Sequence, residues 1–237
     1  MVRLMLTFCT VSTIASAQDD LLAWFPLKIG ARWVYDHEAK AGDRNHPDVD
    51  RWTTEETIAA RLMIPEGLFV LRQVKDLSPL GPIVTRRVIG TDGVVREVQL
   101  PVYHSPLAAR DSQPYLVHGN CLYLIPLHGG WDGQDLSLKY RQFLNEGTLV
   151  PDFCFPLEPG RWWGNNDISW HVGPARDAVA SILPATYAGA IHMLCPHFGS
   201  GGTMDVWFQR GVGVVAEHYI HSGTYDEYTK TLRSLVP

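Results

Sequence analysis

The stretch that decides the fold is residues 25–39, FPLKIGARWVYDHEA. Its second half alternates with a period of two, so that Trp33, Tyr35, His37 and Ala39 share one face of an extended chain. This period is typical of a β-strand, whereas a helix would repeat every 3.6 residues. The Pro and Gly of the first half favour a turn that leads into the strand.

The same alternation recurs along the chain, with Trp52, Thr54, Glu56 and Ile58 on one face of the next segment. Asp92-Gly93 accepts the positive φ angles of a tight turn and predicts a hairpin around it. Further strands are predicted over 52–62, 68–74, 84–89, 94–100, 115–127, 136–144, 168–172, 188–195 and 204–220. We expect a turn at 199–202 between the last two strands.

Helical segments are few and short. Residues 178–183 are too few for a stable helix and are followed by Pro184. Residues 225–235 fit either a helix or an edge strand, and we favour the strand. The predicted fold class is therefore all-β, or β-rich with one or two short helices, built on a single large antiparallel sheet that forms a half-barrel or a sandwich.

One pattern occurs twice, because Phe25–Trp33 and Phe155–Trp163 both match F-P-L-x-x-G-x-x-W. A looser copy spans Ile125–Trp131. In each copy Pro and Gly suit a turn, and the aromatic residues suit a core. We favour structural units that lead a turn into a strand, and the alternative is an aromatic surface that binds a ligand.

These residues resemble a group of uncharacterised exported bacterial β-rich proteins. Such proteins begin with F-P-L-x-x-G-x-x-W-x-Y, here Phe25–Tyr35, and end with an aromatic-x-x-G-V-G-x-V strand, here Phe208–Val215. The resemblance implies an extended antiparallel sheet, in some members similar to the half-barrel of periplasmic lipoprotein carriers. It implies no catalytic residue. Gly211 and Gly213 favour a bulge or a close approach of two backbones.

The first residues have the pattern of a secretory signal peptide. Arg3 precedes an apolar stretch, and Ala15-Ser16-Ala17 is a small-residue cleavage site. We expect residues 1–17 to be removed and residues 18–237 to fold as a single antiparallel β domain in the periplasm or outside the cell. The apolar stretch is shorter than the ~20 residues that span a bilayer, which argues against a retained membrane anchor. No other run of 18 or more apolar residues occurs in the sequence, so no transmembrane segment is expected after cleavage.

The net charge limits the classes of partner that the protein can bind, and the number of cysteines limits the disulfides that it can form. Loss of Arg3 makes the chain one unit more acidic than its formal −5, which disfavours nucleic acid as a partner. Loss of Cys9 leaves Cys121, Cys154 and Cys195. We favour a disulfide between Cys121 and Cys154, because both lie beside similar Pro-Leu turn segments. The alternative is three free buried thiols.

No catalytic or metal-binding motif is evident. The chain lacks G-x-S-x-G, H-E-x-x-H and C-x-x-C, so we assign no catalytic residue, metal or cofactor. Strand alternation puts His192 and Cys195 on opposite faces, and likewise His218 and His221, which disfavours a shared metal site.

Residues 43–50 carry oxygen ligands at alternate positions but depart from a calcium loop, and a solvated loop is favoured. Asp205 and Glu217 receive no catalytic role.

The strongest local signal for a ligand is a group of tryptophans near polar residues. The candidate binding residues are Trp131, Trp162, Trp163 and Asn165, although core tryptophans beside a polar turn are favoured.

Three functions remain open. The first is a non-catalytic envelope protein that binds a hydrophobic ligand on the concave side of its sheet, or an envelope partner. The second is an extracytoplasmic hydrolase acting on a glycan or an ester. The third is a carbohydrate-binding module that uses the tryptophans.

Overall fold

The structure is a computed structural model. It describes residues 21–65, 67–78, 83–89, 95–101, 112–124, 150–174, 181–198, 201–221, 223 and 225–237. The predicted strand at 136–144, the looser repeat at Ile125–Trp131 and the turn at 91–93 lie outside the described residues. Among the described residues, no helix is long and apolar enough to cross a membrane.

The described residues form fourteen strands, one helical turn at 21–24 and one short 3-10 helix, Ala185–Tyr187. The strands are β1 (Arg32–Asp43), β2 (His46–Ile64), β3 (Gly67–Asp76), β4 (Ile83–Ile89), β5 (Val95–Pro101), β6 (Ser112–His118), β7 (Cys121–Leu124), β8 (Phe153–Cys154), β9 (Trp162–Gly164), β10 (Ser169–Val172), β11 (Ile191–Phe198), β12 (Gly202–Gln209), β13 (Gly213–His221) and β14 (Asp226–Val236).

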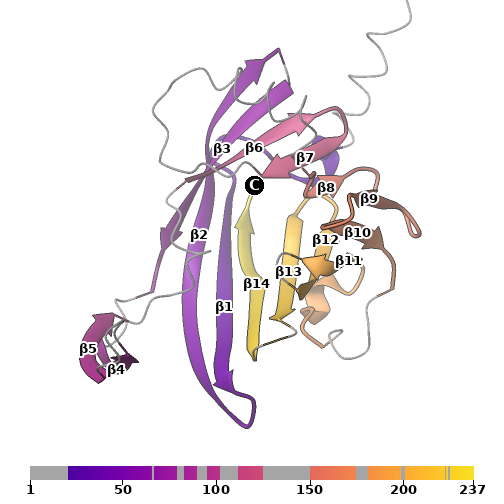
Figure 1. Cartoon of the computed structure of the whole chain (residues 1–237). Coiled ribbons are helices and arrows are strands. Elements are labelled where there is room, and N and C mark those ends of the chain that lie inside the picture. Colours follow the sequence, from indigo (N-terminus) through magenta and orange to yellow (C-terminus); the bar gives the residue numbers. More distant parts are fainter. Residues whose placement is uncertain are drawn as a thin grey trace, which may run out of the picture.

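Twelve strands make one antiparallel sheet in the order β8-β7-β6-β3-β2-β1-β14-β13-β12-β11-β10-β9 (Figure 1). This confirms the predicted all-β class and the single large sheet. The strands β4 and β5 pair in a separate two-stranded sheet, as the hairpin prediction required. The strand at 225–235 is also confirmed, because β14 pairs with both β1 and β13.

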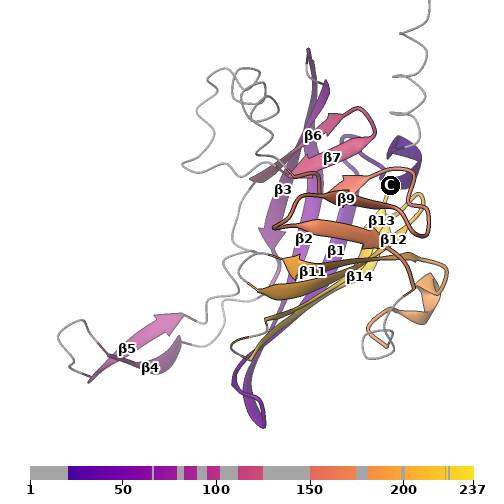
Figure 2. The same ribbon diagram turned by 45° about the vertical axis from the view of Figure 1, so that its right-hand side comes forward.

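The sheet has to curl, because β8 and β9 follow each other in the chain but lie at its opposite edges. A flat sheet of twelve strands would separate its edges by about 50 Å. The connection from Cys154 to Trp162 reaches at most about 30 Å when fully extended. The strands accordingly wrap around a common axis in both views, so the single sheet curls further than the predicted half-barrel and is not a sandwich (Figures 1 and 2).

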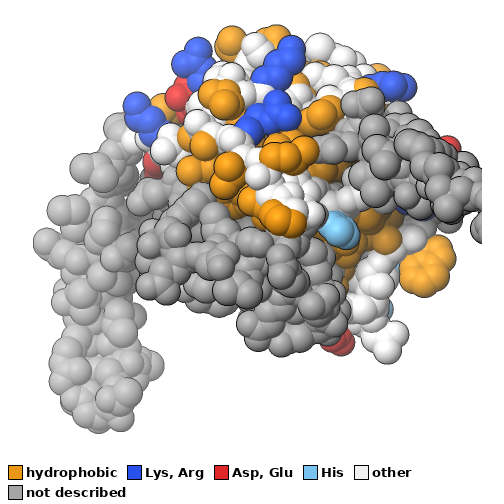
Figure 3. Space-filling view, turned by 90° about the horizontal axis from the view of Figure 1, so that it is seen from above, with side chains coloured by type: hydrophobic (Ala, Val, Ile, Leu, Met, Phe, Trp, Pro, Cys, Tyr) orange, Lys and Arg blue, Asp and Glu red, His pale blue; other side chains and the backbone are white. Residues whose placement is uncertain are grey.

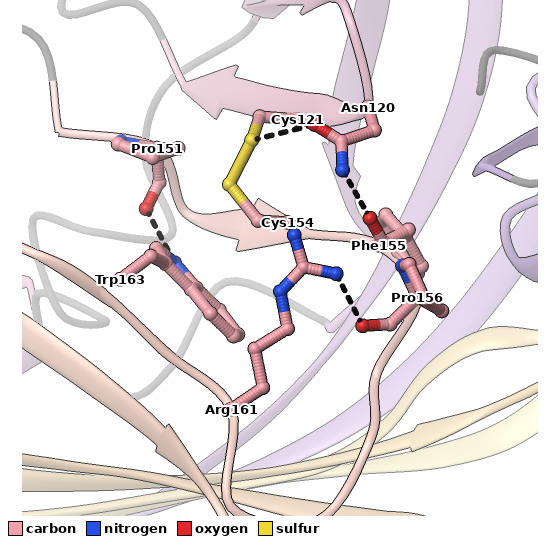
Figure 4. The surroundings of a disulfide bond; sticks show 8 residues. All are labelled: Asn120, Cys121, Pro151, Cys154, Phe155, Pro156, Arg161 and Trp163. Atoms are coloured by element: carbon pink, nitrogen blue, oxygen red, sulfur yellow. Dashed lines mark hydrogen bonds between the residues drawn. A yellow bond between two sulfur atoms is a disulfide. The ribbon is translucent and has the colours of Figure 1, made fainter.

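The two edges meet at a seam that is held by side chains (Figure 4). The indole nitrogen of Trp163 donates a hydrogen bond to the carbonyl oxygen of Pro151 at 3.0 Å. Arg161 donates from its guanidinium to the carbonyl of Pro156 at 2.8 Å. On the other side of the seam, a disulfide joins Cys121 of β7 to Cys154 of β8, the pair that the sequence favours.

The two F-P-L-x-x-G-x-x-W units have the same local structure. Gly30 and Gly160 take φ angles of 86° and 85°, a conformation that a side chain would disfavour. The turns Lys28–Ala31 and Glu158–Arg161 are each closed by a backbone hydrogen bond of 3.0 Å. Both units therefore make the same glycine-dependent turn before a strand, which is the structural interpretation favoured from the sequence.

The aromatic residues of the two units pack together inside one end of the curled sheet. The rings of Phe25 and Phe155 lie 5.8 and 5.5 Å from the ring of Phe208. Gly213 makes room for this packing, because a Cβ there would lie 2.3 Å from the ring of Phe25. The sequence led us to expect a close approach at Gly213, and the structure shows that the ring of Phe25 lies against the backbone of Gly213.

Three predictions from the sequence are wrong, two of strand limits and one of a loop. Residues 115–127 contain a hairpin, because Gly119 takes a φ angle of 59° and turns the chain between β6 and β7. Residues 204–220 likewise form β12 and β13, with a turn closed by a hydrogen bond from the amide of Val212 to Gln209. Residues 43–50 are not a loop, because β1 ends at Asp43 and β2 begins at His46.

Seen from above, the described surface mixes apolar side chains with Lys and Arg (Figure 3). The described large apolar residues that are clearly exposed are Ile29, Val49, Leu62, Met63, Leu77, Trp162 and Val236.

Candidate functional site

The concave face carries a row of alternating charges where the sequence suggested an apolar cavity. The guanidinium of Arg72 lies 2.5 Å from Glu56, and the ammonium of Lys230 lies 3.0 Å from Glu56 and 3.4 Å from Glu217. The row crosses β3, β2, β14 and β13 and passes over β1. Arg72, Glu56 and Lys230 are buried.

The charges in this row stabilise each other. Burial alone would raise the pKa of the Glu56 carboxyl, but the charges of Arg72 and Lys230 overcome it and lower that pKa to about 2. Glu56 is therefore ionised at neutral pH, and the row is electrically balanced. Its members could be recognised in the sequence, since Glu56 and Arg72 each interrupt the apolar face of a predicted strand.

Aromatic rings enclose the row. The Lys230 ammonium lies 4.1 Å from the centre of the Tyr35 ring, and the Arg72 guanidinium lies 4.8 Å from that of Tyr115. Such contacts stabilise a cation in a site with little water. Burial raises the pKa of the Tyr115 hydroxyl, so it stays neutral. The described concave face is thus filled by paired charges and rings.

Asp152 lies beside this filled interior. Burial raises the pKa of its carboxyl to about 6, although the hydrogen bond from the Leu124 amide and the charge of Arg72 act in the opposite direction. A carboxyl of this kind could serve as a general acid.

A second charge network crosses the outer face of the sheet, from β2 to β11. Its successive pairs are Arg51–Glu38 (2.7 Å), Glu38–Lys40 (3.2 Å), Lys40–Glu227 (3.6 Å), Glu227–His218 (3.3 Å), His218–Asp205 (3.6 Å) and Asp205–His192 (2.8 Å). The network begins at a largely exposed arginine and ends at His192, which is buried beside the fully buried side chain of Asp205.

Asp205 brings His192 and His218 together on one face. Asp205 pairs with His218 across β12 and β13, and His192 lies on the same face of β11. The other ring nitrogen of His192 lies 3.2 Å from the carbonyl oxygen of Gly173. The sequence did not point to this cluster, because His192 and His218 were considered there only for a metal site shared with Cys195 and His221, and Asp205 received no role. Among the described residues, no group of three or more His, Cys, Asp or Glu side chains is arranged so that it could hold a metal ion.

The described residues of this outer face line two depressions, and each reaches one of the histidines. The larger, of about 760 Å³, is lined mostly by residues of polar and charged types, among them His218, Glu227, Lys40 and Ser181. The smaller, of about 660 Å³, lies between segment 183–191 and strands β10 to β12. Its lining is Pro159, Val172, Gly173, Pro174, Leu183, Pro184, Ala185, Ala188, Ala190, Ile191, His192 and Trp207. We call the smaller one the apolar depression.

The predicted tryptophan site is divided between core and surface. Trp163 is 8% exposed and belongs to the seam, whereas Trp162 is 65% exposed. The Asn165 side chain accepts hydrogen bonds from the amides of Asp167 and Ile168 and shapes the turn after β9. Trp131 lies outside the described residues.

The described residues offer the components of a hydrolase only in part. The Ser169 hydroxyl lies 3.3 Å from a ring nitrogen of His171. A serine nucleophile also needs a group that orients the histidine and donors for an oxyanion. In the described part of the chain, no carboxylate hydrogen-bonds to His171.

No protein-family model and no curated protein matches the sequence. One similar solved structure is an inferred exported protein with a YmcC-like fold from Bacteroides fragilis, at 9% identity over 90% of this chain and 99% of that chain, with a TM-score of 0.39. Another is an inferred lipoprotein from Parabacteroides distasonis, at 9% identity over 90% and 97%, with a TM-score of 0.37. Likenesses this distant carry no conclusion about function.

Proposed function

We propose that this chain is an exported, non-catalytic protein of the bacterial envelope that binds a small hydrophobic ligand in the apolar depression. In this proposal the signal peptide is cut after Ala17 and residues 18–237 fold as one domain. The observation that supports ligand binding is the mainly apolar lining of the depression.

Export is supported by two independent features. The first is the signal pattern at residues 1–17. The second is the Cys121–Cys154 disulfide, because structural disulfides persist in oxidising compartments outside the cytoplasm. Mass spectrometry of the protein recovered from the periplasm or the medium tests this part. An N-terminus at Gln18 is expected, and an intact Met1 would reject cleavage.

The ligand class follows from the walls of the apolar depression. Ligand sites are mostly apolar, have a few fixed polar groups and enclose roughly 300–1,000 Å³. Here aliphatic residues, prolines and the ring of Trp207 supply the apolar area, and His192, held by Asp205, is the polar side chain of the lining. The concave side of the sheet is less suitable, because the row of charges around Glu56 and Lys230 occupies it.

Fluorescence titration with the hydrophobic probe N-phenyl-1-naphthylamine tests the site. Ala188→Phe adds a ring to the lining and is expected to weaken probe binding roughly tenfold. The matched control is Ser234→Phe, which adds the same ring at an exposed position of β14. Equal affinity in the wild type and in Ala188→Phe would rule out the apolar depression as the site, provided that both variants melt as the wild type does.

A further inference from the structure

Trp162 is an exposed aromatic residue on the outer face near one edge of the sheet. It is paired with His171 across β9 and β10, and His171 is paired with Leu194 across β10 and β11. Trp162 and His171 are both exposed, and Leu194 is half-buried. Since paired residues of adjacent strands project from the same face, the indole and the imidazole are neighbours on that face.

Polar groups accompany the indole. Ser169 lies two residues before His171 and therefore on the same face, and its hydroxyl is 3.3 Å from the imidazole. Gly164, paired with Ser169, adds no side chain. The ring of Trp162 is thus bordered by a hydroxyl and an imidazole that both donate and accept hydrogen bonds. We call Trp162, His171 and Ser169 the Trp162 platform.

The size of this platform argues against a protein partner. A stable protein interface buries about 800 Å² on each side around a cluster of apolar residues. Trp162 is the one clearly exposed large apolar residue among the described residues of β9, β10 and β11. A single ring next to hydrogen-bonding groups matches one sugar ring, which has an apolar face for stacking and hydroxyls at its edge.

We propose that the Trp162 platform binds a glycan, with one sugar ring stacked on the indole and its hydroxyls bonded to His171 and Ser169. The platform is separate from the apolar depression, whose lining includes none of these three residues. This inference therefore stands or falls independently of hydrophobic ligand binding. Its setting outside the cytoplasm, where envelope glycans occur, does rest on the export proposal.

Isothermal titration of the mature chain with two soluble oligosaccharides, tetra-N-acetylchitotetraose and maltotetraose, tests the platform. The expected result is saturable binding of at least one of them at millimolar concentration or below. Trp162→Ala is expected to weaken that binding at least tenfold, and Trp162→Phe less, because the smaller ring still stacks. His171→Ala is expected to weaken it several-fold through the lost hydrogen bonds.

Ile29→Ala is the matched control, since Ile29 is an equally exposed apolar residue, 66% against 65% for Trp162, in a turn outside the platform. It is expected to bind as the wild type does. Unchanged binding in Trp162→Ala would overturn the proposal, and so would the absence of binding to both sugars. A change of sedimentation coefficient in Trp162→Ala, with no sugar bound by the wild type, would assign the indole to a contact between two copies instead.

Discussion

The indole nitrogen of Trp163 binds the carbonyl oxygen of Pro151, and this contact joins the two edges of a twelve-stranded sheet. Trp163 lies on β9 at one edge, and Pro151 lies just before β8 at the other edge. The chain between them is the second F-P-L-x-x-G-x-x-W unit. That unit therefore closes the curl, while the first unit leads into β1 at the middle of the sheet.

Loss of the Trp163 hydrogen bond should weaken the seam without leaving a large cavity in the core. Trp163→Phe retains an aromatic ring but leaves the Pro151 carbonyl without this donor, and we expect the free energy of unfolding to fall by roughly 1–3 kcal/mol. Urea denaturation measures this change. Trp162→Phe, at an exposed position next in sequence, should stay within about 0.5 kcal/mol of the wild type. Equal effects of the two variants would contradict the role of the seam.

The disulfide should stabilise the edge strand β8, because it joins β8 to its neighbour β7. Cys121 and Cys154 are 33 residues apart, and cross-links of this kind contribute about 2–4 kcal/mol. We expect a reducing agent to lower the urea midpoint of the wild type and to leave the Cys121→Ser/Cys154→Ser double variant unchanged. A wild-type midpoint that does not respond to complete reduction would show that the disulfide is dispensable for stability.

The strands were predictable where burial alternates along one segment. Trp33 and Tyr35 face the core because a period of two is a local property of the chain. The hairpin of β6 and β7 was missed because Gly119-Asn120 lies within a run of apolar residues that resembles one strand. The pairing of Glu56 with Lys230 was not predictable, since it depends on the register of strands that are far apart in the sequence.

The tryptophans illustrate the same limit. Two adjacent residues of a strand point to opposite faces, so one of Trp162 and Trp163 had to face away from the core. The sequence does not say which, because both are equally apolar. The seam decides it, since Trp163 lies on the face that reaches Pro151.

The row of charges on the concave face should make the protein acid-sensitive. The pKa of Glu56 is about 2 in the folded chain against 4.5 in the reference state, so the unfolded chain binds more protons between these values. Stability from Glu56 is present above pH 4.5 and is lost as the pH falls towards 2. Its size is on the order of 3 kcal/mol.

Glu56→Gln separates this effect from other carboxyl groups. At neutral pH the variant should be less stable by about 3–5 kcal/mol, because Arg72 and Lys230 lose a buried partner. Between pH 4.5 and 2 its stability should fall less than that of the wild type. Parallel pH profiles of the two proteins, from thermal unfolding, would show that Glu56 is not the acid-sensitive group.

Asp152 should have the opposite pH dependence. Its pKa is raised by burial to about 6 from 3.8, so the folded chain holds a proton that the unfolded chain has already lost. The charged form is disfavoured in the fold, and stability therefore decreases as the pH rises from 3.8 to 6, by about 3 kcal/mol.

Asp152→Asn keeps an oxygen for the Leu124 amide and cannot ionise. Above pH 6 this variant should unfold at higher denaturant concentration than the wild type, and near pH 3 the two should coincide. A variant that is less stable than the wild type at pH 7 would mean that the ionised carboxylate is stabilised in the fold, the direction in which the charge of Arg72 acts.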